Sequence, residues 1–524
     1  MTAPSNDTTT SRPRRRGAPD LVRSARRRLT ADDVTVVDGP LLKRAVTAAA
    51  LGNAMEWFDF GVFAYLATTI GQVFFPSADP TASTISAFAT FTAAFLVRPL
   101  GGVVFGPLGD RIGRQRVLAL TMVLMAAGTF AIGLVPGYDR IGLWGAVLLL
   151  LARLLQGFST GGEYGGAATF IAEYAPDRRR GALGAWLEFG TLGGYVLGAG
   201  LVTALQATLS DDALLAWGWR VPFLVAGPLG VIGLYLRLRL EETPAFQRQQ
   251  AALAEREAER TPVVRLLAEH WRPLLVCIGL VLVFNVTDYM LLSYMPTYLT
   301  ETLGSDATDG LVLVIVVMVV MMAVIGLGGR LSDRFGRRPV LFAGCIGFIV
   351  LSWPALALVQ TADPWLGFCG LLLMGLVLVT FTSTMPSTLP ALFPTAVRYG
   401  ALAIAFNVSV SLFGGTTPLV TEALVAAAHD AGLPWADDVP ALYLVVAAVI
   451  GLVAVACTTE TAQEPLLGSG PTVTTEAEAS AVIEQYADPT SAFSRTSWAR
   501  DFATSQIPVV GEQDAPRDRP PSVR

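Results

Sequence analysis

The chain has 524 residues, of which 53% are hydrophobic and only 15% are charged. With a mean hydropathy of +0.53 it is too apolar for an ordinary soluble enzyme, and its solvent is expected to be a lipid bilayer. The net charge of −5 averages an Arg-rich amino terminus with an acidic, mixed carboxyl-terminal tail, so the distribution of charge is more informative than its sum.

The amino-terminal residues 1–44 are predicted to form a disordered cytoplasmic tail. They carry the arginine clusters Arg14–Arg16 and Arg26–Arg28, and they lack the short apolar core and cleavage site of a secretory signal peptide. Binding of these clusters to anionic lipids is the alternative to a tail without a partner.

Twelve apolar runs follow, which predicts an all-α membrane protein of twelve transmembrane helices in two six-helix halves. Residues 45–238 form the first half and 273–459 the second. Between them, 239–272 is predicted to be a cytoplasmic linker, and 460–524 a mostly disordered tail with one short helix near 475–486. The expected spans are 45–74, 83–108, 116–135, 142–174, 181–208, 218–238, 273–300, 309–329, 339–359, 363–392, 399–427 and 440–458.

Arginines crowd the turns on one side of these spans. They occur in the amino terminus, in 109–116, in Arg178–Arg180, in the linker, in 330–338 and at Arg398, whereas the opposite turns hold Arg140 and Arg220. The positive-inside rule therefore places both termini in the cytoplasm of a multi-pass inner-membrane protein.

The two halves repeat one polar turn, between the second and third spans of each. Its first copy includes Gly106, Asp110, Arg111 and Arg114, and its second includes Asp333, Arg334 and Arg337. The aspartates can accept hydrogen bonds from helix amino-terminal N–H groups or pair with an arginine, which predicts a latch that opens and closes the cytoplasmic side. A simple positive-inside turn is the alternative reading. A second repeat makes Glu188 and Asn407 equivalent positions, and such repeats build a transport site between halves.

The repeated turn resembles the signature of the major facilitator superfamily. LGNAMEWFDFG (51–61), QGFSTGGEYGGAATFIAEYAPDRRRG (156–181) and WGWRVPF (217–223) are similar to the metabolite:proton symporters. NVTDYMLLSYMPTYL (285–299) and STLPALFPTAVRYGALAIAFNVSV (387–410) look most like the osmosensory proline/glycine-betaine symporters. The resemblance covers about residues 40–465 and implies proton-coupled import with osmotic activation. Two features depart from it: the tail lacks sustained heptads, and Asp288 stands where an aromatic residue is expected.

Ionisable side chains inside spans are costly and are candidates for function. Asp59 near the centre of the first span and Arg153 near the centre of the fourth are predicted to meet, so that making and breaking the pair loads and releases a proton. The resemblance implies a similar pair, and a static pair that orients helices is the alternative. Glu163 and Glu188 are the next candidates for proton coupling.

Glycines recur at four-residue spacing on two spans, as Gly157, Gly161 and Gly165 and as Gly190, Gly194 and Gly198. This spacing predicts close helix packing. The glycines around Glu163 are not followed by Gly-Lys-Ser/Thr, so no nucleotide-binding loop is expected.

A quaternary ammonium group cannot donate a hydrogen bond, so its recognition needs aromatic faces and a nearby carboxylate. Lipid-facing or packing roles are the alternative for each aromatic residue, and helix-to-helix hydrogen bonding is the alternative for the asparagines. The predicted substrate-binding residues are Trp57, Phe63, Tyr195, Asn285, Asp288, Tyr289 and Asn407.

The sequence thus favours a secondary active transporter that imports a small zwitterion, such as proline or glycine betaine, with protons. A symporter of an anionic metabolite such as a dicarboxylate remains open, as does a non-transporting membrane sensor. The four cysteines fall inside apolar runs at spacings that match no metal site. No catalytic centre, cofactor, metal or nucleic-acid partner is expected.

Overall fold

A computed structural model describes residues 28–112, 114–238, 269–361, 363–395 and 397–504. Most of the predicted tail at 1–44, including all of its clustered arginines except Arg28, and nearly all of the linker at 239–272 lie outside the described residues. Within the helices, the side chains at 41, 106, 107, 109–112, 114–116, 118, 233, 235–238, 497, 501, 503 and 504 are also outside them.

The first half contains helices that match the six expected spans. The first span continues from α1 across Leu66 into α2, and the fourth is interrupted at 160–162, between α6 and α7. The helices are α1 (Gly39–Tyr65), α2 (Ala67–Phe74), α3 (Pro80–Ile112), α4 (Arg114–Leu134), α5 (Tyr138–Ile141), α6 (Leu143–Ser159), α7 (Glu163–Tyr174), α8 (Arg180–Thr208), α9 (Asp211–Ala213) and α10 (Arg220–Leu238).

The second half begins with a long seventh span in which α-helix alternates with wider π-helical turns. Its helices are α13 (Trp271–Tyr289), α14 (Met295–Thr297), α15 (Ala307–Phe335), α16 (Arg337–Val359), α17 (Pro364–Thr382), α18 (Met385–Ala391), α19 (Arg398–Ser409), α20 (Thr417–Asp430) and α21 (Val439–Cys457). The π-helical turns are Met290–Tyr294, Tyr298–Thr302 and Val410–Gly414. Such turns often occur at functional sites, because one extra residue redirects the side chains around it.

Twelve membrane-spanning segments can be counted in the described residues. Nine are long and apolar enough to cross a bilayer by themselves, and a tenth is the pair 211–218 and 220–232, which bends by 41°. The other two are α1 with α2, and α4, whose apolar part is Ala119–Leu134. The protein is therefore an all-α membrane protein with six spans in each half.

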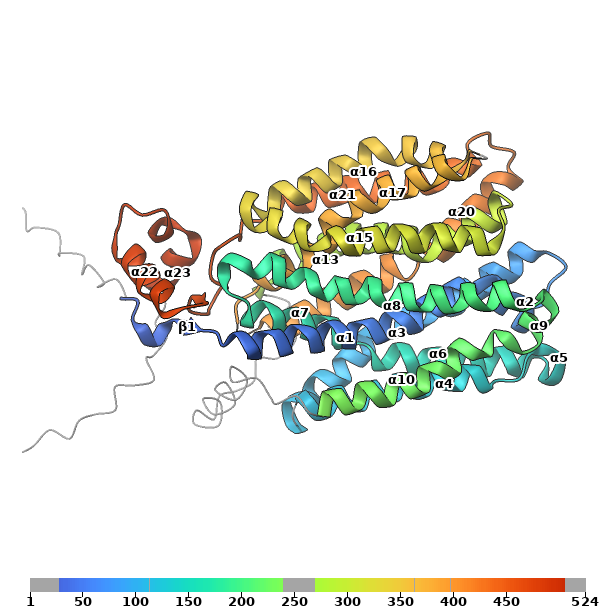
Figure 1. The fold of residues 1–524 in the computed structure, drawn as a ribbon, viewed down its shortest axis with the longest axis horizontal. Helices are drawn as coiled ribbons and strands as arrows, with labels where there is room; N and C mark the ends of the chain where they lie inside the picture. Colours follow the sequence, from blue (N-terminus) through green and yellow to red (C-terminus); the bar gives the residue numbers. More distant parts are fainter. Residues whose placement is uncertain (1–27, 113, 239–268, 362, 396, 505–524) are drawn as a thin grey trace, which may run out of the picture.

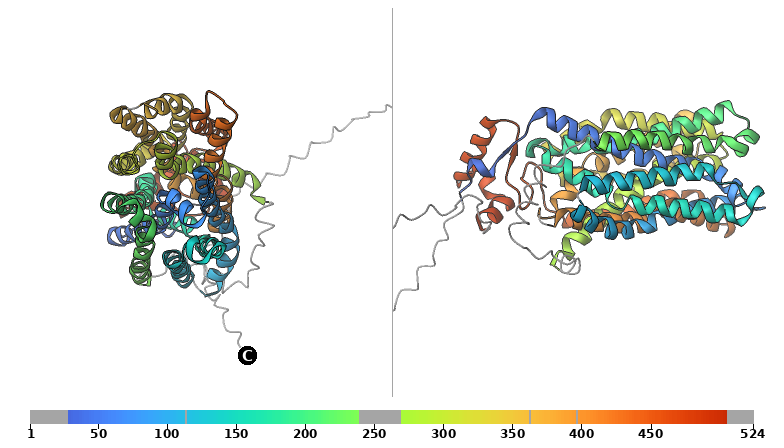
Figure 2. Two further views of the ribbon diagram at one scale, coloured as in Figure 1. Left: turned by 90° about the vertical axis from the view of Figure 1, so that its right-hand side faces the viewer. Right: turned by 90° about the horizontal axis from the view of Figure 1, so that it is seen from below.

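The two halves lie side by side along a shared interface (Figures 1 and 2). Spans five and eight, α8 and α15, run next to each other across it, and α3 contacts α19 and α20. Both described terminal segments lie at one end of the bundle, which we call the latch face. The buried core runs through both halves and includes large aromatic side chains at their interface.

The terminal segments on the latch face are folded, which corrects the prediction of disorder for their described parts. The first helix begins at Gly39, and the short strand β1 (Thr35–Val36) pairs in parallel with β2 (Thr472–Val473). Two further helices pack around Trp498: α22 (Glu476–Ala487), which occupies the stretch of the short helix expected near 475–486, and α23 (Ser497–Thr504), which was not expected. The composition of the tail suggested disorder, but a few aromatic residues suffice for a small core when the strand pair and the transmembrane bundle anchor it.

Candidate functional site

Asp59, the central carboxylate of the first span, is buried and belongs to a chain of polar side chains. Thr129 of α4 donates a hydrogen bond to Asp59 Oδ2 at 2.8 Å and accepts one from Gln156 Nε2 at 3.0 Å. Arg153 in turn donates to Gln156 Oε1. Four residues from three spans thus form a relay: Asp59, Thr129, Gln156 and Arg153.

This relay replaces the direct contact expected between Asp59 and Arg153. Within the described residues the two make no ion pair, although they interact electrostatically. The Arg153 guanidinium instead lies 3.9 Å from the ring centre of Phe63, and Phe60 and Phe91 flank it at 5.4 and 5.3 Å. Aromatic faces attract a desolvated cation, so three rings hold this arginine while Gln156 mediates its link to the acid.

A buried ion pair lies nearby and was not assigned a role from the sequence. Arg98 of α3 donates to Glu56 of α1, and both side chains are almost completely buried. Arg98 also lies against the rings of Phe60 and Phe95. Charged groups inside a membrane are retained when they pair in this way, and the pair ties the first span to the second.

The other two predicted proton carriers have different surroundings. Glu163 begins α7, at the interruption of the fourth span, and Thr121 lies 3.5 Å from it. Glu188 of α8 accepts a hydrogen bond from Tyr164 at 2.7 Å, and the Tyr164 ring stacks on Phe406 of the other half at 3.9 Å. Glu188 therefore borders the interface between halves.

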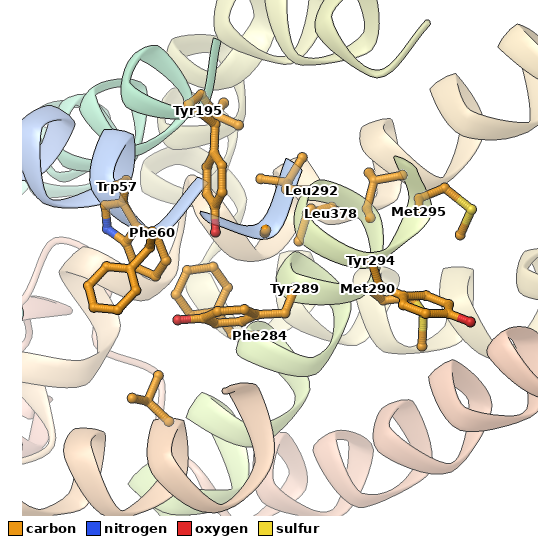
Figure 3. Close-up of a cluster of buried hydrophobic side chains, with 14 of the residues drawn as sticks. Trp57, Phe60, Tyr195, Phe284, Tyr289, Met290, Leu292, Tyr294, Met295 and Leu378 are labelled. Atoms are coloured by element: carbon orange, nitrogen blue, oxygen red, sulfur yellow. The ribbon is translucent and has the colours of Figure 1, made fainter. Parts of the chain in front are cut away.

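Three of the predicted substrate residues gather at that interface. The Trp57 ring lies 5.4 Å from that of Tyr195 and 5.6 Å from that of Tyr289, and the Tyr195 hydroxyl lies 3.2 Å from Ser293 Oγ (Figure 3). Trp57 and Tyr195 come from the first half and Tyr289 from the second. We call these three residues the aromatic cluster.

Asp288 borders the aromatic cluster and is only 3% exposed. It acts electrostatically on the hydroxyls of Tyr195 and Tyr289 and on Glu188. Its Oδ1 atom has no hydrogen-bond partner among the described residues, and neither does Trp57 Nε1. Buried polar atoms are normally paired, so these unpaired atoms make the aromatic cluster and its surroundings a candidate site for a polar ligand.

The remaining predicted substrate residues point elsewhere. Phe63 contacts Arg153, as described above. Asn285 donates to Val281 O of its own helix at 2.9 Å, and Asn407 donates to Gly161 O of the first half and to Ala403 O at 2.8 Å. Asn407 therefore has the helix-to-helix bonding that was the alternative reading for it.

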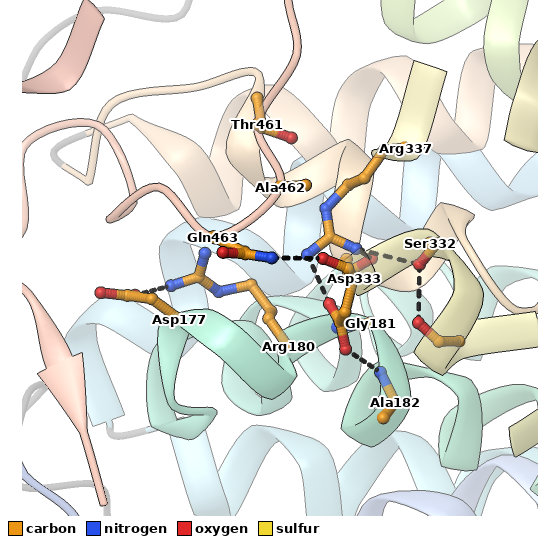
Figure 4. A network of polar contacts seen from close by, with 12 residues as sticks. Asp177, Arg180, Gly181, Ala182, Ser332, Asp333, Arg337, Thr461, Ala462 and Gln463 are labelled. Carbon is orange, nitrogen blue, oxygen red and sulfur yellow. Dashed lines mark hydrogen bonds and ion pairs between the residues drawn. The ribbon is translucent and has the colours of Figure 1, made fainter. Parts of the chain in front are cut away.

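The second copy of the polar turn joins the two halves on the latch face. Asp333, near the end of α15, accepts hydrogen bonds from the backbone N–H groups of Gly181 and Ala182 at 2.7 and 2.8 Å (Figure 4). These groups belong to the amino-terminal end of α8, where a carboxylate is favoured by the helix dipole. Arg337 completes the contact with an ion pair to Asp333 at 3.2 Å.

Two more points concern the latch face. Arg398 of the second half forms an ion pair with Glu173 of the first at 2.7 Å, so a second bridge crosses the same end of the interface. Arg334 lies beside Phe335, 5.4 Å from its ring centre. The first copy of the turn, with Gly106, Asp110, Arg111 and Arg114, has side chains outside the described residues.

One buried acid escaped the sequence analysis. Glu422 of α20 accepts a hydrogen bond from Tyr294 at 3.0 Å, and Tyr294 lies in a π-helical turn of the seventh span. Glu422 lies inside the expected span 399–427, and the sequence analysis assigned it no role. In the described residues no group of three or more His, Cys, Asp or Glu side chains is arranged to hold a metal ion.

Comparison with known proteins identifies close relatives. The glycine betaine/proline/ectoine/pipecolic acid transporter OusA of Dickeya dadantii (strain 3937) is 50% identical over 463 residues, which cover 87% of this chain and 91% of that protein. The proline/betaine transporter of Escherichia coli (strain K12) is 48% identical over 88% of this chain and 92% of its own length. The ectoine/proline transporter ProP of Corynebacterium glutamicum is 43% identical, with coverages of 88% and 93%.

The fold has close counterparts among solved structures. The proton:xylose symporter XylE bound to 6-bromo-6-deoxy-D-glucose aligns with a TM-score of 0.65 over 82% of this chain and 98% of its own, at 18% identity. At that identity the likeness concerns the fold alone. The profile of the Major Facilitator Superfamily matches residues 49–418. The chain therefore belongs to the major facilitator superfamily, and it is a membrane transporter rather than an enzyme.

Proposed function

We propose that this transporter imports a zwitterionic compatible solute, such as glycine betaine or proline, together with protons. The observation that carries the proposal is that two polar sites lie close together in the interior of the protein. One is the relay that ends at Asp59, and the other is the aromatic cluster with Asp288. The names of the relatives support the solute class, because OusA and the two other transporters are named for betaine, proline or ectoine.

The relay suits proton coupling because it connects an ionisable carboxylate to a fixed positive charge through groups that can both donate and accept. A hydroxyl and an amide between the two charges let the carboxylate bind a proton without an arginine directly against it. Asp59 is the carrier in this proposal, Arg153 its counter-charge, and Glu163 and Glu188 the secondary candidates.

The latch face is the cytoplasmic face in this proposal, and both termini are cytoplasmic. Support comes from the arginines that contact the carboxyl-terminal segment on the latch face, Arg180, Arg337, Arg338 and Arg398, and from Arg178, Arg179, Arg330 and Arg334 in the same turns. Asp333 then closes the cytoplasmic side by holding α8 against α15. In this proposal, uptake also rises with external osmolality.

Uptake into liposomes tests the proposal. Purified protein in sodium-free buffer receives an inward proton gradient and radiolabelled betaine, proline, ectoine or a dicarboxylate. We expect accumulation of the zwitterions that collapses on addition of a protonophore and is insensitive to ATP and sodium. Accumulation that survives the protonophore would contradict proton coupling, and accumulation of the dicarboxylate alone would favour the anionic alternative.

A further inference from the structure

We propose that Asp288 makes a positive charge on the solute a requirement for binding. This inference rests on the proposed function and identifies the residue that makes the transporter selective for zwitterions over anions. Asp288 is buried, its Oδ1 is unpaired, and it borders three aromatic rings from both halves. A buried carboxylate in this position binds either a proton or a cation, so a positively charged group on a solute bound between the halves competes with the proton for Asp288.

Among the described residues, none of the groups that interact electrostatically with Asp288 carries a positive charge. Its electrostatic neighbours are Glu188 and the hydroxyls of Tyr65, Tyr164, Tyr195 and Tyr289. Both nearby arginines have other partners, because Arg98 pairs with Glu56 and Arg153 is bound by Gln156 and phenylalanine rings. The region around Asp288 is therefore negative, unlike the region around Asp59.

The opposite end of the solute has a donor available in the same cluster. Trp57 Nε1 is unpaired, and so are two nitrogens of Arg98, whose charge acts on Tyr289. A solute with a carboxylate near Trp57 and an ammonium group near Asp288 satisfies both kinds of unpaired atom at once. The faces of Tyr195 and Tyr289 add the attraction of aromatic rings for a methylated ammonium group.

A matched pair of probes isolates the charge. Glycine betaine and 3,3-dimethylbutyrate have the same shape, but a quaternary carbon replaces the nitrogen, so the second probe lacks the positive charge. Binding of each is measured by calorimetry on the purified protein, for wild type, Asp288→Asn and Asp288→Glu. Glu422→Gln serves as the control, since it neutralises another buried carboxylate that is bonded to Tyr294.

We expect wild type to prefer betaine by at least about tenfold, which is the scale of a buried charge pair. Asp288→Asn should lose most of that preference, Asp288→Glu should retain it in part, and Glu422→Gln should leave it unchanged. A wild-type protein that binds both probes equally overturns the inference without any variant. So does a folded Asp288→Asn protein with full preference. If neither probe nor any zwitterion binds wild type, the proposed function itself fails.

A separate observation on the latch face points to a regulatory device. We infer that residues 458–473, which we call the strap, lock the latch face in its closed state. Glu460 accepts hydrogen bonds from the backbone N–H groups of Arg337 and Arg338 at 2.9 and 3.1 Å, and Gln463 donates to Asp333 O at 2.8 Å (Figure 4). These contacts attach the strap to the second half.

The strap is also attached to the first half. Arg180 donates to Glu464 O at 2.8 Å, and the N–H of Thr472 donates to Asp177 Oδ2 at 3.0 Å. Beyond this point β2 pairs with β1, and Trp498 of the folded tail donates to Ser469 O at 2.9 Å. Because the strap binds both halves beside Asp333, the latch face cannot open fully until one set of these bonds breaks.

Two truncations provide a matched test. One ends the chain after Thr458 and removes the strap, and the other ends it after Thr504 and keeps the strap and the helices α22 and α23. In a background in which the exposed Cys369 and Cys457 are replaced by serine, a cysteine introduced by Ala185→Cys, buried on α8, reports opening through its alkylation by a membrane-impermeant maleimide in inside-out vesicles. We expect alkylation to be several-fold faster without the strap and unchanged in the longer truncation.

Point variants keep this test decisive if the shorter chain is unstable. Glu460→Gln combined with Gln463→Ala removes strap bonds in an otherwise complete chain, and it should accelerate alkylation in the same direction. Alkylation that stays at the wild-type rate in both the folded truncation and the double variant overturns the lock.

Discussion

Replacing Thr129 by valine should separate proton release from solute transport. Valine has nearly the shape of threonine but lacks the hydroxyl that donates to Asp59 at 2.8 Å and accepts from Gln156 at 3.0 Å. The change therefore interrupts the relay at its middle while the packing of α4 is preserved. Neither charged member of the relay is altered.

The size of the effect follows from the geometry of the hydroxyl. A hydrogen bond to a charged group contributes about 1.5–3 kcal/mol. The Thr129 hydrogen has a competing acceptor in Met125 O at 3.0 Å, so the lower end applies, about 1.5 kcal/mol. Since about 1.4 kcal/mol is a factor of ten, deprotonation of Asp59 becomes roughly tenfold less favourable. A bond to the charged form stabilises that form, and its loss favours the proton-bound state.

Proteoliposomes loaded at a series of internal pH values measure this shift. Gradient-driven accumulation by Thr129→Val should reach its maximum at an internal pH roughly one unit higher than for wild type, because release of the proton inside now needs a lower proton concentration. Exchange of internal for external solute needs no net proton release and should remain within a few-fold of wild type. Thr129→Ser, which keeps the hydroxyl, is the control. A valine variant with the wild-type pH profile would refute the relay as the coupling path.

Three further outcomes are expected. Asp59→Asn, which cannot ionise, should abolish accumulation against a gradient and retain exchange; normal proton stoichiometry in this variant would move the carrier to Glu163 or Glu188. Asp333→Ala removes two charge-assisted hydrogen bonds worth about 1.5–3 kcal/mol each. It should therefore lower turnover by at least tenfold. The Kd for solute, measured by calorimetry on the purified variant, should change less than threefold. Gly194→Ala should lower the melting temperature in detergent by several degrees or prevent folding, because its Cβ would lie 2.2 Å from Ala54 O; an unchanged melting temperature would show that α1 and α8 separate easily.

The fold was largely predictable because the bilayer constrains it so strongly. Apolar runs of the required length recur twelve times, and the repeated turn divides them into two equivalent sets. The expected span 181–208 differs from α8 by one residue. The strap and the folded tail were not predictable in the same way, since their stability comes from contacts with Asp177, Arg180 and Arg337, which are distant in the sequence.

The candidate site was predictable only in its charged members. Asp59 and Arg153 stand out because charges are rare inside spans, but the groups that connect them, Thr129 and Gln156, are uncharged and have no sequence signal of their own. Asp288 stood out by its departure from the resembling family. Its lack of a partner, and the different neighbours of Phe63 and Asn407, depend on helix rotations that hydropathy does not determine.

The glycines of the first half have a mechanical consequence. A Cβ at Gly190 or Gly194 would lie 2.1 or 2.2 Å from a backbone oxygen of α1, and one at Gly157 would lie 1.8 Å from Ala94 O of α3. Backbones in such direct contact cannot slide past each other without losing it. We therefore expect spans one and five to move together as one rigid unit, and spans two and four as another. On this expectation Asp59 and Glu188, which both belong to the first unit, keep a constant separation, and their distances to Asp288 change as the halves move.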